Sequence, residues 1–303
     1  MATTGELLTY NQLSEWRKDN PCILAGYRQE THSWKGCLQG LCFWHNESAN
    51  TWSHLLGAII SITLLVRGLS PNNLPVFERM DVIHAYKTSK TASDDGFDSL
   101  GMWLFLLGCF VCFTCSATFH GSLCHSHSVA AVMNRVDYLG ILILGTLNYF
   151  STFHYAFFCH PHIRNLYIFL MSLSGSIGIY LVCAPKYATP SYRRMRTYTF
   201  FALGFVVIFP FIHAMFKYGP AHVSQAIALE WLIVEATAYI FGALMYAERC
   251  PEFWFPGRFD FIGSSHQIFH ICSMIATWAH YISLSKSYQF WWYGAGSGSC
   301  VMF

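Results

Sequence analysis

Three histidines lie in apolar surroundings, where an ionisable side chain is costly. His120 ends one apolar stretch, and His266 and His270 begin another. Polar groups at membrane depth are expensive and usually functional, so each of these histidines needs a partner. His266 and His270 are four residues apart, which places both rings on one face of a helix, where they can bind one ion. The residue types and their spacing therefore predict a metal site.

The composition is that of a membrane protein. The 303 residues are 54% hydrophobic and only 11% charged, whereas about 25% of the residues of soluble domains are charged. A net charge of +2 gives no argument for binding to nucleic acid. The first 40 residues are polar and mixed in charge, so we expect no cleavable signal peptide and insertion through internal helices.

Apolar stretches long enough to cross about 30 Å of hydrocarbon define the expected architecture. We identify seven, at roughly 50–66, 99–120, 134–156, 165–183, 198–217, 226–246 and 266–285. The sequence therefore predicts an all-α, seven-transmembrane helix bundle over 49–286, with a cytoplasmic segment at 1–48 and a short tail at 287–303. Pro210 is expected to kink the fifth helix, because proline removes a backbone donor and clashes with the preceding turn.

Lysine and arginine residues indicate the orientation. With seven spans, eleven of them fall on the side of the N-terminus and seven on the opposite side, and the densest basic block, at 191–197, is on the N-terminal side. Positive residues favour the cytoplasm, so we expect a cytoplasmic N-terminus and a luminal or extracellular C-terminus. This orientation is opposite to that of a G-protein-coupled receptor and argues against that class.

The alternation of helix direction brings the polar residues to one leaflet. Even-numbered spans end, and odd-numbered spans begin, on the N-terminal side, so His120, Asp137, His266 and His270 are all expected there. Three neutral imidazoles leave a fourth tetrahedral position open, as in catalytic zinc sites. Asp137 is then expected to orient or deprotonate a water bound to Zn²⁺, and Ser116, one turn before His120, to assist it.

Simpler interpretations compete with this one. A single histidine, or a pair at this spacing alone, is more often a hydrogen-bonded interior residue than a metal ligand. We assign that structural role to His280. Glu235 lies deep in the sixth stretch and requires a partner, for helix packing or for a role in a cavity. The twelve cysteines do not indicate a disulfide framework.

Two motifs near the ends of the chain are interpreted as structural or accidental. Glu47 adds a negative charge where a helix N-terminus favours it, and Asn50 is expected to cap that helix. We regard a structural role for Glu47, Asn50 and His54 as favoured over a catalytic one. The last four residues, beginning at Cys300, match a prenylation box, but seven spans place them outside the cytosol, where prenylation does not occur.

Four motifs occur in order along the chain: ESANTWSH at 47–54, S-x-x-x-H at 116–120, D-x-x-G at 137–140 and H-x-x-x-H at 266–270. Together they resemble the progestin and adipoQ receptor family, which is related to haemolysin III and the alkaline ceramidases. The resemblance covers nearly the whole chain from about residue 10. It implies seven helices, an intracellular N-terminus, and a zinc ion near the cytoplasmic face.

The resemblance assigns that zinc to His120, His266 and His270, with Asp137 and Ser116 beside it. In adiponectin receptors and ceramidases, such a site is linked to hydrolysis of ceramide-type amides. The resemblance therefore implies a zinc-dependent lipid amide hydrolase or receptor, in contact with membrane lipids and a lipid amide ligand.

Within the family, the segments at 18–28 and 255–270 resemble most the Golgi-resident branch that traps Raf kinases. That likeness implies a scaffold in the Golgi membrane, with the plasma membrane as the alternative location. The scaffold would bind a cytosolic kinase through residues 1–48 and so dampen MAPK signalling. From the sequence we favour the scaffold as the cellular role, with the zinc-dependent hydrolase as the alternative and a receptor for a secreted hormone as a third hypothesis.

Overall fold

The computed structural model describes residues 6–68, 100–184, 190–293 and 300, and in this part of the chain the regular elements are helices. The long helices are α2 (Ser48–Gly68), α4 (Leu100–Ser122), α5 (His127–Ala156), α6 (Pro161–Cys183), α10 (Leu229–Glu248) and α11 (Ser265–Tyr293). Shorter ones are α1 (Trp34–Gln39), α7 (Arg193–Phe205), α8 (Ile208–Tyr218) and α9 (Pro220–Ala226). Each predicted apolar stretch coincides mainly with one long helix, except the fifth, which is divided between α7 and α8.

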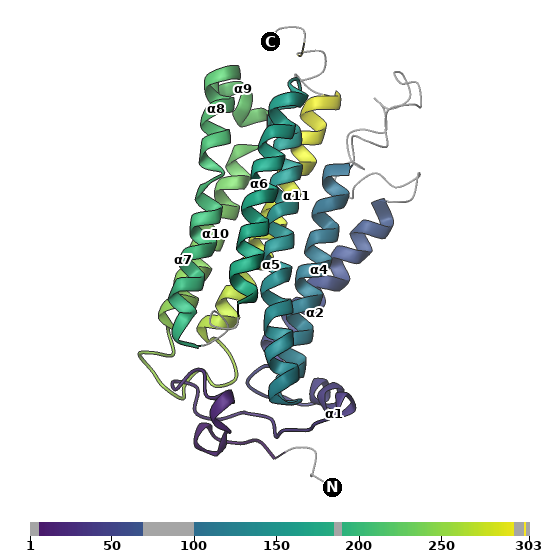
Figure 1. Ribbon diagram of the computed structural model, residues 1–303. Helices are drawn as coiled ribbons and strands as arrows, with labels where there is room; N and C mark the ends of the chain where they lie inside the picture. The colour runs from purple at the N-terminus through teal and green to yellow at the C-terminus, as the bar shows by residue number, and fades with distance from the viewer. Residues whose placement is uncertain (1–5, 69–99, 185–189, 294–299, 301–303) are drawn as a thin grey trace.

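The long helices form an elongated bundle (Figure 1). The most extensive packing joins α4 to α5 and α2, and α10 to α11. Four helices of the described chain, α2, α4, α5 and α10, are long and apolar enough to cross a membrane.

The break in the fifth predicted helix has a local cause. Pro210 lies in the first turn of α8 and cannot donate a hydrogen bond to the carbonyl of Val206, four residues earlier, where α7 has just ended. Val206 and Val207 join the two helices without leaving the right-handed helical region. The kink predicted at Pro210 is thus confirmed as a short interruption. A second break was not expected: Ala228 has a φ of 46°, and α10 begins after it rather than at residue 226.

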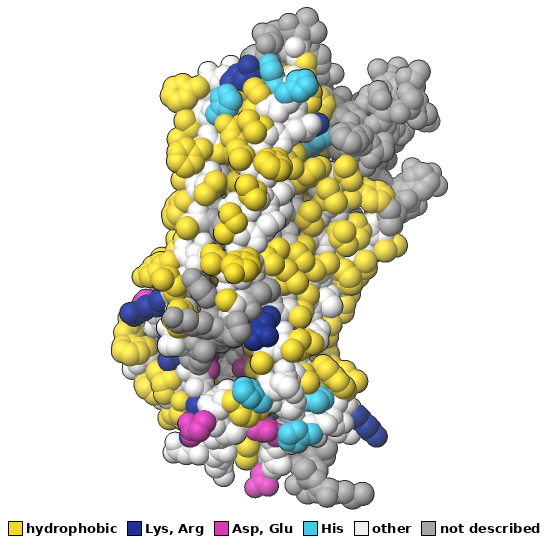
Figure 2. Space-filling model, viewed as in Figure 1, with side chains coloured by type: hydrophobic (Ala, Val, Ile, Leu, Met, Phe, Trp, Pro, Cys, Tyr) yellow, Lys and Arg dark blue, Asp and Glu magenta, His cyan; other side chains and the backbone are white. Residues whose placement is uncertain are grey.

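The surface of the bundle is apolar around its middle. Figure 2 shows a broad area of hydrophobic side chains over this part, with most of the basic, acidic and histidine side chains of this face gathered towards the two ends. Large apolar residues that are exposed include Phe169, Tyr180, Phe209, Phe216 and Phe241. A soluble monomer rarely exposes so much contiguous apolar surface, whereas lipid solvates it well.

The N-terminal segment is a folded cap at the end of the bundle where α4 ends and α11 begins (Figure 1). Leu8 and Tyr27 form an antiparallel bridge within it. Arg28 is buried, and its guanidinium donates to the carbonyl oxygens of His120 at 2.7 Å and Gly121 at 2.8 Å. These carbonyls are in the last turn of α4, where carbonyl oxygens have no backbone N–H partner within the helix. The cap is therefore part of the structure that holds His120.

A disulfide joins Cys159, just after α5, to Cys300, beyond the end of α11. The cysteine spacing did not predict it. The bond occupies the thiol that the terminal prenylation box would need, which agrees with our interpretation of that box as accidental. Residues 301–303 of the box are outside the described chain.

We predict that Arg28→Ala lowers stability by about 1.5–3 kcal/mol, because it removes charged donors from two buried carbonyls. The measurement is the thermal unfolding midpoint of the purified protein in detergent. Lys35→Ala is the control, since Lys35 is exposed on α1. Equal midpoints for the Arg28 and Lys35 variants would contradict the role given to Arg28.

Candidate metal centre

The structure brings the three histidines together. Their candidate ligand nitrogens all lie within 4.8 Å of one another. His120 comes from the last turn of α4, and His266 and His270 come from the first two turns of α11. The closest approach is between Nε2 of His120 and Nε2 of His266, at 3.2 Å. We call these three residues the histidine triad.

Hydrogen bonds behind two of the rings determine which nitrogen is available. His120 Nδ1 lies 2.7 Å from Glu47 Oε2 and donates to that carboxylate. His270 Nδ1 lies 3.2 Å from the carbonyl oxygen of Asn50, which can only accept. Each ring therefore carries its proton on Nδ1 and leaves a lone pair on Nε2. Lone pairs that converge in a buried site repel one another unless a cation lies between them, so this donor set fits a metal ion.

Glu47 supports the triad through His120, whereas its position before a helix predicted only a role at the helix N-terminus. Besides accepting from His120, its carboxylate accepts from the amide of Asn50 at 2.7 Å. Burial alone would raise the pKa of Glu47, but hydrogen bonds from His120 and Asn50 and the charges of His120 and His266 outweigh it and hold the pKa well below its usual range. Glu47 is thus a carboxylate, and such a group behind a ligand imidazole fixes its orientation and raises its basicity. Asn50 lies inside α2 and is not its cap.

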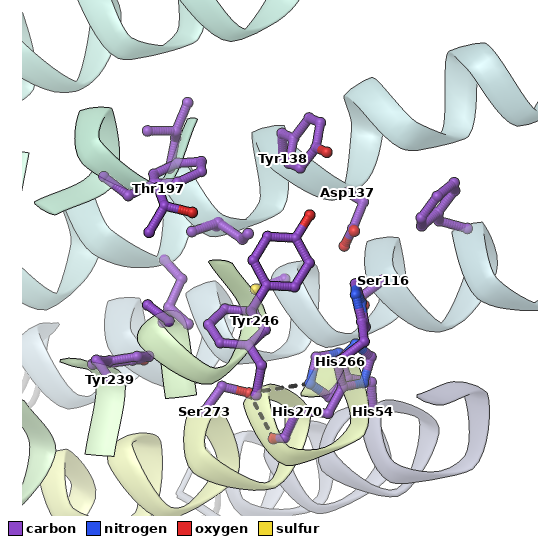
Figure 3. A pocket seen from close by; sticks show the side chains of 18 of the residues that line it. His54, Ser116, Asp137, Tyr138, Thr197, Tyr239, Tyr246, His266, His270 and Ser273 are labelled. Atoms are coloured by element: carbon purple, nitrogen blue, oxygen red, sulfur yellow. Dashed lines mark hydrogen bonds between the residues drawn. The ribbon is translucent and has the colours of Figure 1, made fainter. Parts of the chain in front are cut away.

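His54 performs a similar supporting role behind His270. The two rings stack in parallel with centroids 3.6 Å apart. His54 Nε2 lies 3.1 Å from the hydroxyl of Ser273, which itself donates to the carbonyl oxygen of His270 (Figure 3). Glu47, Asn50 and His54 follow one another at helical spacing of three and four residues. That spacing was the available signal that all three face the same neighbour.

Asp137 and Ser116 lie next to the triad, as proposed from the sequence. Both are buried, and the Ser116 hydroxyl lies close to the Asp137 carboxyl group. Figure 3 shows that carboxyl group directed towards Ser116 and His266. The approach of α5 to α4 here depends on Gly140, since a Cβ at this position would lie 3.0 Å from the Cα of Cys112. The glycine of the D-x-x-G motif thus brings Asp137 within reach of the site.

A cavity of about 1050 Å³ begins at the triad and extends between the helices. His120, His266, His270 and Asp137 form part of its wall. Much of the remaining lining is apolar and comes from α5, α7, α8 and α10, including Ile141, Phe200, Ile208, Phe211 and Ile240. In Figure 3, Tyr138, Tyr246, Tyr239 and Thr197 surround the space in front of the triad. A cavity of this size and polarity suits a long apolar ligand with a polar group placed at the triad.

We predict that the purified protein holds a transition metal and that His270→Ala loses it. Glu47→Gln should weaken metal affinity about 10- to 100-fold, because it removes the anion that orients His120. The measurement is metal content by mass spectrometry during titration with a chelator. The matched control is Glu248→Gln, whose carboxylate forms an exposed ion pair with Arg194. A Glu47 variant that retains metal as firmly as the control would show that Glu47 does not support the site.

Comparisons with known proteins agree with these features. The family model described as haemolysin-III related matches residues 42–281. An ADIPOR-like receptor of Eremothecium gossypii is 32% identical over 299 residues, covering 98% of this chain and 90% of its own length. The adiponectin receptor protein of Drosophila melanogaster is 31% identical over 277 residues, covering 91% of this chain and 58% of its own length. Heptahelical transmembrane protein 3 of Arabidopsis thaliana is 30% identical over 297 residues, covering 91% of this chain and 86% of its own length.

These relatives are described as receptors and as heptahelical membrane proteins, and they match along almost the whole chain. Together with the apolar helices, they identify a multi-pass membrane protein. The resemblance drawn from the four motifs to the progestin and adipoQ receptor family is confirmed. The chain belongs to the haemolysin-III-related family and is similar to its adiponectin-receptor-like members.

Proposed function

We propose that this protein is a zinc-dependent hydrolase of lipid amides that acts within the membrane. The observation that carries the proposal is the placement of the histidine triad and Asp137 in the wall of a large, mainly apolar cavity. A purely structural metal site would have no need of such a cavity. A lipid amide has a polar carbonyl to place at the triad and long chains to fill the remaining space.

The triad is compatible with a zinc ion. Two nitrogens bound tetrahedrally to one zinc at 2.0–2.1 Å lie about 3.3 Å apart, and the separation between His120 and His266 is 3.2 Å. Three imidazole ligands leave one position open for water or substrate. When bound there, zinc acts as a Lewis acid and lowers the pKa of a coordinated water.

The residues around the triad supply a proton acceptor, groups that position the reacting side chains, and an apolar environment. Two acidic residues of the cavity wall lie beside the triad, Glu47 and Asp137. Glu47 is already bonded to the imidazole of His120, so Asp137 is the carboxylate available to accept a proton. Ser116 lies beside the carboxyl of Asp137, and Glu47 holds His120. The mainly apolar lining of the cavity lowers the dielectric constant around the reacting carbonyl, which strengthens each of these electrostatic interactions.

The proposed topology has seven spans and a cytosolic N-terminus. The excess of basic residues on the N-terminal side supports it. The disulfide between Cys159 and Cys300 supports it as well, because disulfides persist in oxidising compartments, and this one lies at the end of the bundle opposite to the N-terminal cap. The triad would then lie near the cytosolic face of the membrane.

A scaffold is the second candidate function. Large apolar side chains are exposed at the capped end, on α1 and in the segment between α10 and α11: Trp34, Leu38, Phe253 and Trp254. Exposed residues of this kind mark binding surfaces for proteins or for the membrane interface. This surface supports a scaffold that binds a cytosolic protein, and the resemblance proposes a kinase of the Raf type at the Golgi membrane. The kinase and the Golgi location are drawn from the resemblance alone.

We predict that the wild-type protein releases long-chain fatty acid from ceramide and that Asp137→Asn lowers kcat about 100-fold or more, since a general base contributes 10²–10⁴ in rate. Metal content should not change, because Asp137 is not among the proposed ligands. Glu248→Gln serves again as the unaffected control. Turnover that survives in both Asp137→Asn and His270→Ala would exclude the proposed mechanism. Bound zinc without any turnover would favour the scaffold.

The scaffold requires a test that leaves the metal centre intact. Deleting 1–48 would remove Arg28 and Glu47, which hold His120, so point variants on the surface of α1 are needed. If the scaffold is correct, Trp34→Ala with Leu38→Ala abolishes retention of a Raf kinase on Golgi membranes, measured by co-localisation. Lys35→Ala on the same helix and Asp137→Asn should retain it. Retention by the double variant would rule out this surface.

A further inference from the structure

A second polar cluster lies deep in the same cavity, and the proposed hydrolysis does not use it. It consists of Glu235 on α10, His280 on α11, and Asn148 and Ser151 on α5. His280 Nδ1 lies 2.7 Å from Glu235 Oε2, and the Asn148 amide donates to Glu235 Oε1 at 3.2 Å. Glu235, His280 and Asn148 all contribute to the wall of the cavity. His280 and Asn148 are therefore the partners that Glu235 was expected to need.

The position of the cluster along the helices sets its depth. On α11, ten residues separate His270 from His280, and on α5, eleven separate Asp137 from Asn148. At 1.5 Å per residue, His280 lies about 15 Å from His270 along α11, and Asn148 lies about 16.5 Å from Asp137 along α5. Since the hydrocarbon of a bilayer is about 30 Å thick, a triad near one face puts the cluster near the middle of the membrane. Polar groups at that depth are costly unless they serve a function.

Both ring nitrogens of His280 have partners within the cluster. Nδ1 lies 2.7 Å from the Glu235 carboxylate, and Nε2 lies 3.3 Å from the Ser151 hydroxyl. The Ser151 hydroxyl in turn lies 2.8 Å from the carbonyl oxygen of Asn148. His280 is thus held between α5 and α10, and the Glu235 carboxylate is the group of the cluster that offers acceptor atoms to a ligand.

The cluster is not closed on itself. The Glu235 side chain keeps 13% of its surface exposed although it lines an internal cavity. Each carboxylate oxygen can accept two hydrogen bonds, and one protein donor is found for each. Among the described residues, Asn148 Oδ1 is buried without a hydrogen-bond partner. Acceptors therefore outnumber donors here, and a ligand that fills the cavity would meet free lone pairs on Glu235.

We propose that Glu235, held by His280 and Asn148, is a binding subsite for a hydroxyl group in the middle of a long lipid chain. This inference rests on the proposed function, which places the carbonyl or carboxyl end of the lipid at the histidine triad. The ligand class is an amide of a long-chain fatty acid that carries a hydroxyl about 15 Å from its carbonyl. The hydroxyl donates to Glu235, which an unsubstituted chain cannot do.

The test compares fatty acids, the acyl products of the proposed reaction, as ligands of the full-length protein in nanodiscs. The probes are octadecanoic acid and its 12-hydroxy, 12-methoxy and 2-hydroxy derivatives, measured by competition against a fluorescent C18 acid. In an extended chain, the 12-hydroxyl lies roughly 14 Å from the carboxyl. We expect 12-hydroxyoctadecanoic acid to bind about five- to tenfold more tightly than the other three, because only it places a donor at the cluster.

A double variant tests whether the cluster itself is responsible. Glu235→Leu with His280→Leu replaces the buried pair with apolar side chains, a change that proteins often tolerate. This variant should lose the preference for the 12-hydroxyl while it still binds octadecanoic acid and retains its metal. The control is Glu230→Leu with Lys286→Leu, which removes an exposed ion pair between the same two helices.

Three results would overturn the subsite. The protein could bind all four acids equally, it could bind none of them, or the double variant of Glu235 and His280 could keep the preference for the 12-hydroxyl. Ceramide turnover measured on the same samples separates the two proposals. Turnover without a hydroxyl preference would overturn the subsite alone. A hydroxyl preference without turnover would support the subsite and overturn the hydrolase.

Discussion

The hydrogen bond between Glu47 and His120 is the interaction on which the candidate site depends. It joins residue 47, just before α2, to the last turn of α4, across 73 positions of sequence. Through it the N-terminal cap determines which nitrogen of His120 faces the site. Arg28 of the cap also donates to the backbone oxygen of the same histidine. The cap and the metal centre are therefore one structural unit, and changes in the cap are expected to affect metal binding.

The cost of polar groups in hydrocarbon explains the arrangement of the interior. The described helices expose apolar side chains around the middle of the bundle, and their polar groups are turned inwards, where hydrogen bonds satisfy most of them. Two polar groups of residues in the described part of the chain line the cavity, with apolar lining between them: the histidine triad with its supporting residues, and the cluster around Glu235. This pattern is typical of a cavity that receives an amphiphilic molecule: polar groups fix its orientation, and the apolar wall accommodates its chain.

Much of the helical arrangement follows from patterns that a single sequence contains. Apolar length predicted the positions of the long helices, and the missing backbone donor of Pro210 predicted the break between α7 and α8. The alternation of helix direction placed His120, Asp137 and His266 in one leaflet without any knowledge of packing. Conversely, nothing local indicated the left-handed backbone at Ala228 or the start of α10 after it, because such a conformation depends on the packing of the surrounding helices.

The supporting residues of the site were harder to predict, for a physical reason. Glu47 lies beside a helix N-terminus, where a carboxylate is favourable with or without a metal centre, so its local context suggested a simpler role. Its contact with His120 is a tertiary one and leaves no periodic signal. The same holds for the pairing of Cys159 with Cys300 and for the cavity, since both depend on the relative placement of helices. Glu235 was recognised as needing a partner, but the sequence could not identify His280.

The central claim is that the histidine triad binds zinc, and X-ray absorption at the zinc edge of the purified wild-type protein tests it most directly. We expect zinc with three imidazole nitrogens at about 2.0–2.1 Å and a fourth light ligand, since three histidines leave one tetrahedral position open. The spectrum should lose imidazole scattering in His266→Ala. Sulfur scattering at about 2.3 Å, or an absence of zinc in well-folded protein, would contradict the assignment of the histidine triad as a zinc centre.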